Sequence, residues 1–204
     1  MNKQVFLLSK RALDIFASIC GLIVLSPLFL IISLWIKIDS TGPIFFRQER
    51  VGLHGQNFLI HKFRSMRTDT EKMSQLTIGD DARITRSGKF IRKYKLDELA
   101  QLIDVLVGKM SLVGPRPEVP KYMNLYPANE KAVILSVKPG ITDLASIAMI
   151  NENDILAQYP DPHQAYIDII MPMKSRYYLE YANKNSIFFD IKIIFLTLFK
   201  IFKS

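Results

Sequence analysis

The feature that most limits how this 204-residue chain can fold is an apolar stretch from Ala12 to Ile36, in which Asp14 is the one charged residue. A helix of this length can cross a hydrocarbon core, which is about 30 Å thick. The stretch is longer than the apolar core of a secretory signal peptide, and no small-residue cleavage site ends it. The sequence therefore predicts a membrane helix attached to one compact domain.

Two features bear on whether this helix crosses the membrane. Pro27 has no N–H to donate to the carbonyl of Ile23, so we expect a bend there, with the Ser26 hydroxyl helping to satisfy the freed group. Cationic residues, which favour the cytoplasmic side, flank both ends of the stretch. They are Lys3, Lys10, Arg11, Lys37, Arg47 and Arg50. A re-entrant helix keeps both ends on one side, but proline also kinks spanning helices, so the residues alone leave both arrangements open.

The carboxyl end of the chain is also apolar. Ser186 to Lys203 is rich in Phe and Ile and carries few charges, as is typical of a helix that lies in the membrane interface. A buried helix that packs on the rest of the domain is the alternative.

Between these ends the pattern predicts a small mixed domain. Residues 44–46 and 57–63 are expected to form a hairpin, because the loop between them contains two glycines. The polar stretch 68–80 fits a mobile helical segment, and cationic residues recur at every third position from Arg83. Apolar residues at helical spacing predict a helix from Asp97 to Val107. The expected fold class is mostly α with short β strands (α+β).

Two proline-containing segments are predicted as loops. Residues 111–120, SLVGPRPEVP, contain three prolines, which disfavour a regular helix or strand and fix the backbone around Arg116. Residues 138–142, KPGIT, introduce a second loop. Gly108 is expected to end the helix that precedes the first of these loops.

The charge balance points to an anionic partner. The chain has 27 Lys and Arg against 19 Asp and Glu, a net charge of +8. Such a balance suits a phosphorylated substrate, an acidic lipid surface or nucleic acid, and charge alone does not choose among them. The single cysteine, Cys20, excludes an internal disulfide.

Asp97 and Glu98 form the most informative acidic pair. Acidic residues in the first turn of a helix often do no more than favour its positive end, and this is the simplest interpretation of the pair alone. Cationic residues nearby in the sequence favour a site instead: Lys62, Arg64, the edge that includes Arg92, and Arg116 between two prolines. Together these groups suit a pyrophosphate and its metal ion.

Five ordered motifs give the chain a specific resemblance. They are KRALDI with Ser26 and Pro27, then RQERVGLHGQNFLIHKFRSM, LDELAQLIDVLVGKMSLVGPRP, KPGIT and FFDIKIIFLT. In this order, over nearly the whole chain, they resemble the bacterial sugar transferase family, the monotopic polyprenol phosphate phosphoglycosyl transferases.

The resemblance implies an activity. It implies transfer of a sugar 1-phosphate from a UDP-sugar to polyprenyl (undecaprenyl) phosphate with release of UMP, by a ping-pong route through Asp97. Asp97 and Glu98 would be catalytic and would bind Mg²⁺, with Glu98 either a metal ligand or a base. Lys62, Arg64, Arg92 and Arg116 would bind substrate phosphates.

The resemblance also implies a location and a domain division. It implies a re-entrant helix broken at Ser26 and Pro27 in residues 1–40, a cytoplasmic catalytic domain in 41–185 and an amphipathic interfacial helix in 186–204. The protein would sit at the cytoplasmic face of the bacterial inner membrane, in contact with membrane lipid. Nucleic acid is not an expected partner, and a homodimer is left open.

Departures from the family pattern limit what can be carried over. Asp143 and Leu144 stand where many relatives have a glycine and an aromatic residue, so the sugar cannot be inferred from the motif. Tyr178 stands where an acidic residue is frequent. A basic, membrane-anchored binding protein without catalysis, for acidic lipid or nucleic acid, is the alternative function.

Overall fold

The computed structural model describes residues 3–67, 81–149 and 152–203, so the predicted polar segment 68–80 lies outside it. The helices are α1 Lys3–Asp39, α2 Arg86–Lys93, α3 Leu102–Leu106, α4 Pro120–Met123, α5 Ala128–Ile134, α6 Leu144–Ala148, α7 Glu152–Leu156, α8 Pro162–Ala165, α9 Met171–Lys184 and α10 Ile187–Lys203. Shorter helical turns are the 3₁₀ turns η1 Leu53–Gly55 and η3 Leu96–Gln101 and the π turn η4 Tyr166–Ile170. The strands are β1 Phe45–Val51, β2 Asn57–Phe63, β3 Ser111–Val113 and β4 Gly140–Thr142. This secondary-structure content confirms the predicted mostly helical fold with short strands.

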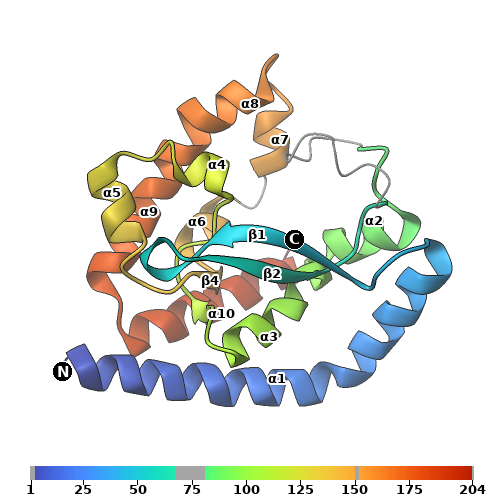
Figure 1. The fold of residues 1–204 in the computed structure, drawn as a ribbon, viewed down its shortest axis with the longest axis horizontal. Helices are drawn as coiled ribbons and strands as arrows, with labels where there is room; N and C mark the ends of the chain where they lie inside the picture. Colours follow the sequence, from blue (N-terminus) through green and yellow to red (C-terminus); the bar gives the residue numbers. More distant parts are fainter. Residues whose placement is uncertain (1–2, 68–80, 150–151, 204) are drawn as a thin grey trace.

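Helix α1 runs along one side of the domain and bends before its end (Figure 1). The bend is explained by Pro27, which lies inside the helix. The Ser26 hydroxyl donates to the carbonyl of Ile23 over 2.8 Å, as predicted. Among the described residues, α1 is the one helix long and apolar enough to cross a membrane, and most of its apolar stretch is exposed.

Polar residues near the start of α1 fasten it to the domain. Lys10 donates to the carbonyl of Val113 over 3.0 Å and to Asp190 over 2.6 Å. Arg11 donates to two carbonyls at the end of α3, those of Val105 and Leu106. These contacts add side-chain donors to carbonyls at the ends of α3 and β3. The KRALDI motif thus holds the apolar helix at a fixed place against the soluble part.

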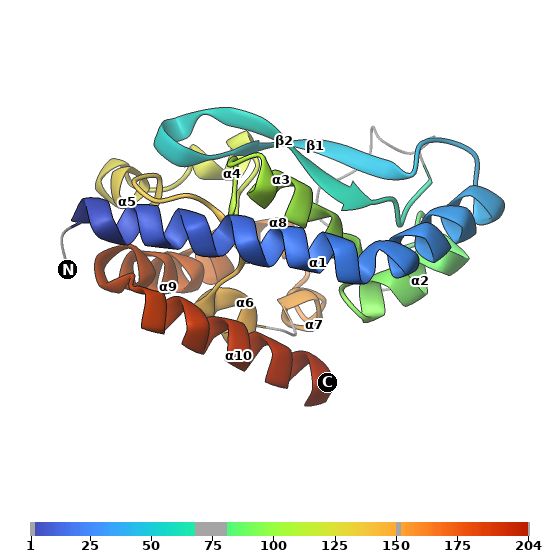
Figure 2. The ribbon, with the colours of Figure 1, turned by 90° about the horizontal axis from the view of Figure 1, so that it is seen from below.

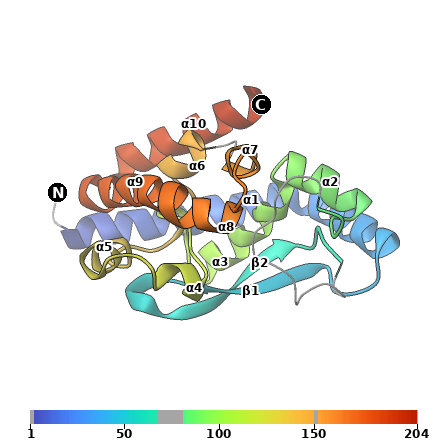
Figure 3. The same cartoon turned by 90° about the horizontal axis from the view of Figure 1, so that it is seen from above.

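The predicted hairpin is present, and its first strand is longer than expected. β1 pairs antiparallel with β2, from Phe45 opposite Phe63 to Val51 opposite Asn57. The first strand continues to Val51, whose side chain is buried although it shares a face with the exposed Arg47 and Glu49, and whose backbone nitrogen donates to the carbonyl of Glu118 over 2.9 Å. Figure 3 shows the hairpin and α10 on opposite sides of α9.

The prediction that residues 111–120 and 138–142 lack regular strand was wrong in part. β3 and β4 form a short parallel pair in which Ser111 lies opposite Gly140. The pair forms because two glycines let the backbones meet: a Cβ on Gly140 would lie 2.1 Å from the nitrogen of Gly114. The prolines that follow end β3 after three residues.

Helix α10 lies beside α1 on the same side of the domain (Figure 2). One side of α10 is buried at Asp190 and Ile193. Its other side exposes large apolar residues, namely Phe188, Phe195, Leu198 and Phe199. The helix therefore packs on the domain through one side and presents an unburied apolar surface on the other.

Candidate active site

Asp97 and Glu98 lie in the first turn of η3, the 3₁₀ turn that precedes α3. The helix predicted from Asp97 to Val107 is present in two parts, the 3₁₀ turn η3 Leu96–Gln101 and the α-helix α3 Leu102–Leu106. Lys95, just before η3, has a left-handed backbone with φ of 56°, and it redirects the chain where α2 ends. Asp97 is buried at 9 % exposure as a result.

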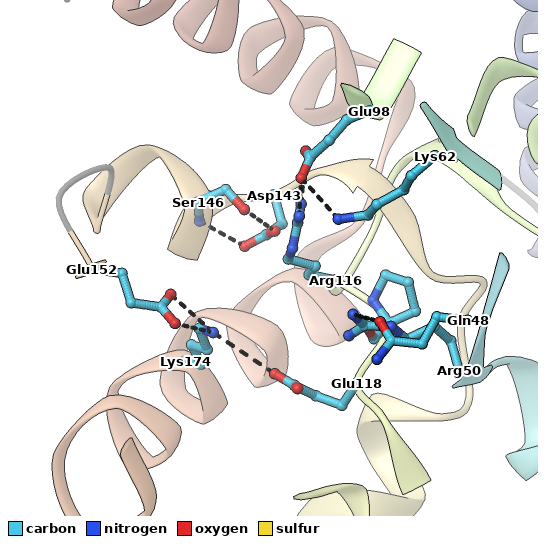
Figure 4. A network of polar contacts seen from close by, with 11 residues as sticks. Gln48, Arg50, Lys62, Glu98, Arg116, Glu118, Asp143, Ser146, Glu152 and Lys174 are labelled. Carbon is cyan, nitrogen blue, oxygen red and sulfur yellow. Dashed lines mark hydrogen bonds and ion pairs between the residues drawn. The ribbon is translucent and has the colours of Figure 1, made fainter. Parts of the chain in front are cut away.

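Glu98 is bound by two cations from distant parts of the chain (Figure 4). Arg116 forms a two-pronged ion pair with it: Nη1 donates to Oε2 over 3.0 Å, and Nη2 donates to Oε1. Lys62 Nζ, from β2, lies 3.3 Å from the same Oε1. Both carboxylate oxygens of Glu98 are thus engaged, and the pair fixes the guanidinium of Arg116.

The two acids have opposite electrostatic behaviour. Burial raises the pKa of Asp97, and the adjacent Glu98 charge raises it further. Burial also disfavours the charged form of Glu98, but Arg116 and Lys62 outweigh it and hold the pKa of Glu98 well below its usual range. Glu98 is therefore a fixed anion, whereas Asp97 is the group whose charge depends on what binds beside it.

A cavity of about 790 Å³ opens beside the acidic pair. Helices α1, α3 and α10 contribute mainly apolar side chains to its wall, including Ala17, Leu102 and Ile194. The charged part of its wall comes from β2, α2, η3 and the loop after β3, and consists of Lys62, Arg92, Lys95, Asp97, Glu98 and Arg116, with Glu152, Lys174 and Lys200 from later elements. One cavity thus joins a polar, cation-rich region to the surface of the membrane helix.

Most of the predicted phosphate ligands lie in this cavity. Lys62, Arg92 and Arg116 line it, whereas Arg64 does not. Arg64 is buried at 2 % exposure, and its guanidinium donates to the carbonyls of Ser40 and Thr41 at the end of α1, each over 2.7 Å. These contacts give Arg64 the role of fixing the second half of α1, and we leave it out of the site.

Several polar residues near the cavity escaped sequence reasoning. Asp143 is buried and caps α6 by accepting from the nitrogen of Ser146 over 3.0 Å. Glu118, Glu152 and Lys174 form a group on the other side of Arg116 (Figure 4). Glu118 follows the GPRP motif directly and could have been noticed there. The sequence around Glu152 and Lys174 contains no motif that links them, because they meet only when α7 and α9 pack in the folded domain.

The acidic pair offers limited ligands for a metal. Within 3–67, 81–149 and 152–203, no three acidic, histidine or cysteine side chains gather as a metal cluster. Mg²⁺ usually takes one or two carboxylates together with substrate phosphates and water. Asp97 fits that pattern, since none of the hydrogen bonds among the described residues uses its carboxylate and it lines the cavity. Glu98 fits less well, because Arg116 and Lys62 engage its oxygens.

Comparison with known sequences identifies a family. The sequence profile of the family described as "Bacterial sugar transferase" matches residues 5–204. The chain is 39 % identical over 197 residues to the UDP-glucose:undecaprenyl-phosphate glucose-1-phosphate transferase of Escherichia coli (strain K12), a match that covers 95 % of this chain and 40 % of that protein.

Two further relatives differ in length and in named substrate. A UDP-N-acetylgalactosamine-undecaprenyl-phosphate N-acetylgalactosaminephosphotransferase from Aeromonas hydrophila is 38 % identical over 150 residues, which cover 72 % of this chain and 36 % of that protein. The uncharacterized sugar transferase EpsL of Bacillus subtilis (strain 168) is 36 % identical over 195 residues, 96 % of this chain and 88 % of that protein. The chain thus spans well under half of the two relatives with named substrates and nearly all of a shorter one.

Proposed function

Because this chain belongs to the bacterial sugar transferase family, we propose that it moves a sugar 1-phosphate from a UDP-sugar to polyprenyl phosphate and releases UMP. This reaction is taken from the names of two relatives, which are transferases that use a UDP-sugar and undecaprenyl phosphate. The observation that carries the proposal is the cavity in which the buried carboxylate of Asp97, the cations Lys62, Arg92 and Arg116, and apolar side chains of α1 and α10 share one wall. Such a site can receive a charged nucleotide sugar and a lipid at the same carboxylate.

In the first half-reaction, a carboxylate oxygen of Asp97 attacks the β-phosphorus of the donor. The new bond joins Asp97 to the sugar phosphate, while the bond from that phosphorus to the bridging oxygen breaks and its electron pair leaves with UMP. Lys62, Arg92 and Arg116 lie where they can stabilise the negative charge on the phosphoryl oxygens. In the second half-reaction, an oxygen of polyprenyl phosphate attacks the same phosphorus and Asp97 leaves.

Glu98 then has a positioning role. Its oxygens already accept from Arg116 and Lys62, so it holds those cations in place, and a proton or a metal ion would have to compete with them. Mg²⁺, bound by Asp97 and the pyrophosphate of the donor, would supply further neutralisation of charge. The sequence left two roles open for Glu98, metal ligand or base, and its pairing with Arg116 and Lys62 supports neither role.

The apolar wall suits the acceptor. An isoprenoid tail stays in the membrane because each buried CH₂ group is worth about 0.8 kcal/mol. Gly21 of α1 and Leu198 of α10 line the cavity that contains Asp97, and exposed apolar residues continue along both helices. The phosphate of polyprenyl phosphate can therefore reach Asp97 while its isoprenoid tail remains in the membrane beside α1.

We place the catalytic part at the cytoplasmic face, with α1 re-entrant. The bend at Pro27 and the cationic flanks at both ends of α1 support this arrangement. A Lys3→Cys variant in a Cys20→Ser background should be labelled by an impermeant maleimide in inside-out vesicles and not in intact spheroplasts. Labelling from the outside only would mean that α1 crosses the membrane.

Turnover with a panel of donors tests the reaction. Purified protein in nanodiscs, with Mg²⁺ and undecaprenyl phosphate, should release UMP from at least one of UDP-glucose, UDP-galactose, UDP-N-acetylglucosamine and UDP-N-acetylgalactosamine. Chelation of Mg²⁺ by EDTA should stop the release, and added Mg²⁺ should restore it. No UMP from any donor, together with tight binding to anionic vesicles, would instead favour a binding protein without catalysis.

A further inference from the structure

A second, smaller pocket adjoins the catalytic cavity on the far side of Arg116. It has a volume of about 130 Å³, roughly ten times the 10–15 Å³ that one water needs. Arg116, Glu152 and Lys174 line both this pocket and the larger cavity, so the two share part of their walls. The remaining polar residues of its wall are Arg50, Glu118 and Tyr166.

These side chains are held in a fixed network. Lys174 Nζ lies 2.9 Å from Glu152 Oε2 and 3.8 Å from Glu118 Oε1, and it donates to the hydroxyl of Tyr166 over 3.1 Å. The Tyr166 hydroxyl in turn donates to Glu118 Oε1 over 2.9 Å. Glu118 and Lys174 are almost completely buried, at 4 % and 6 % exposure. Such a network presents acceptors and donors at set positions.

The network keeps capacity for more hydrogen bonds. The buried Nε of Arg50 has no hydrogen-bond partner within the described ranges. Among the described residues, the hydrogen bond to the carboxylate of Glu118 is accepted by Oε1, so Oε2 can accept another. Buried polar groups nearly always find partners, so the unpaired Nε of Arg50 in the wall of this pocket points to an occupant, for which Glu118 Oε2 is a further acceptor.

The position of Arg116 indicates which part of the donor enters. Arg116 contacts Glu98 and lines both the small pocket and the cavity that contains Asp97, so a phosphate that binds Arg116 beside Asp97 has the residues of the small pocket as neighbours. In a UDP-sugar, the sugar is joined to the β-phosphate through one oxygen. The uracil is farther away, beyond the α-phosphate and the ribose. The group that can reach the pocket from the reacting phosphorus is therefore the sugar.

We propose that this pocket, formed by Arg50, Glu118, Glu152, Tyr166 and Lys174, binds the pyranose ring of the donor and selects the sugar. The inference rests on the proposed transferase function. Carboxylates accept from sugar hydroxyl groups, and Lys174 and Arg50 donate to ring, hydroxyl or acyl oxygens. A site built to bond a substrate hydroxyl discriminates strongly against a donor that lacks it.

The test compares binding of the sugar with binding of the nucleotide. In an Asp97→Asn background, which prevents turnover, calorimetry with Mg²⁺ gives the Kd of UDP and of the four UDP-sugars used above. Glu152→Gln keeps the shape of the side chain and removes its charge. It should weaken the best-bound UDP-sugar by about tenfold or more and change the Kd of UDP by less than about twofold. Asp154→Asn, on the exposed part of α7, is the matched control and should change neither Kd.

Glu118→Gln is the second variant, and its melting temperature shows whether it folds. It should give the same selective loss, because the new amide oxygen would still accept from Tyr166 while the charge is gone. If both variants bind the UDP-sugar as tightly as the parent, the sugar-pocket proposal is wrong although the transferase proposal stands. An equal loss for UDP and UDP-sugar would assign the pocket to the nucleotide and would overturn the proposal too. If neither the unsubstituted protein nor the Asp97→Asn protein binds any UDP-sugar, the transferase function and the pocket assignment fail together.

Discussion

Asp97→Asn is expected to lower UMP release by about 10³-fold or more while the protein stays folded. The amide is similar in shape but cannot form the bond to phosphorus, and loss of a nucleophile is among the most damaging changes that an enzyme can suffer. The rate of UMP release in nanodiscs, with the best donor of the panel, measures the loss. Asp168→Asn, at an exposed position of η4, should keep full activity.

We also expect a definite direction for the change in folding stability of Asp97→Asn. Burial raises the pKa of Asp97, so its protonated form favours the folded state, and that contribution is lost as the pH rises through the raised pKa. Ionisation of Asp97 in the folded protein therefore costs stability, and the uncharged amide avoids that cost. The melting temperature of Asp97→Asn at pH 7 should equal or exceed that of the parent. A large drop would mean that the lost activity reports misfolding.

Arg116→Met is expected to damage both activity and stability. It leaves the partly buried carboxylate of Glu98 without its main partner. Breaking a fully buried pair costs about 3–5 kcal/mol, and we expect a smaller loss here because the pair is partly exposed and Lys62 still contacts Glu98. It also removes a cation beside the transferring phosphoryl group, which we expect to lower kcat/KM by about 10²–10³-fold. Thermal unfolding and donor kinetics measure the two effects. Arg176→Met, an exposed position of α9, should change neither.

A double variant separates the two effects. Arg116→Met with Glu98→Gln should recover part of the lost stability, because the carboxylate that lost Arg116 is gone while Lys62 keeps only the neutral amide oxygen as a partner, and it should not recover activity. Acid should also reduce the stability loss of the single variant. Glu98 has a lowered pKa in the parent, so its contribution to stability is present above its unfolded pKa of about 4.3 and is lost as the pH falls through the folded value. Equal stability of parent and Arg116→Met at pH 7 would contradict the role of the pair.

Much of this architecture could be predicted from local signals. The bend at Pro27 and its Ser26 contact follow from the missing N–H of proline. The hairpin followed from alternating apolar residues around two glycines, and Gly108, at φ of 86°, ends the helix as expected. These features depend on neighbours a few residues away, which a sequence displays directly.

Features that depend on distant contacts could not be predicted. The pairing of β3 with β4 requires Gly114 and Gly140 to meet across a long connection, and the prolines nearby pointed to loops instead. Arg64 occurs in a basic motif beside Lys62, yet it turns to the end of α1 while Lys62 turns to Glu98. Residues two apart in a strand share a face, but β2 ends at residue 63, so that rule no longer holds for the arginine that follows.

The central claim is that Asp97 becomes covalently bonded to the sugar phosphate, and mass spectrometry of the protein tests it most directly. The protein is mixed with its best UDP-sugar and Mg²⁺ without polyprenyl phosphate, quenched in acid and digested. The account predicts that the peptide containing Asp97 gains the mass of one sugar phosphate, that the gain is absent in Asp97→Asn, and that it disappears when undecaprenyl phosphate is added before the quench. An unmodified Asp97 peptide from protein that turns over normally would contradict the two-step route.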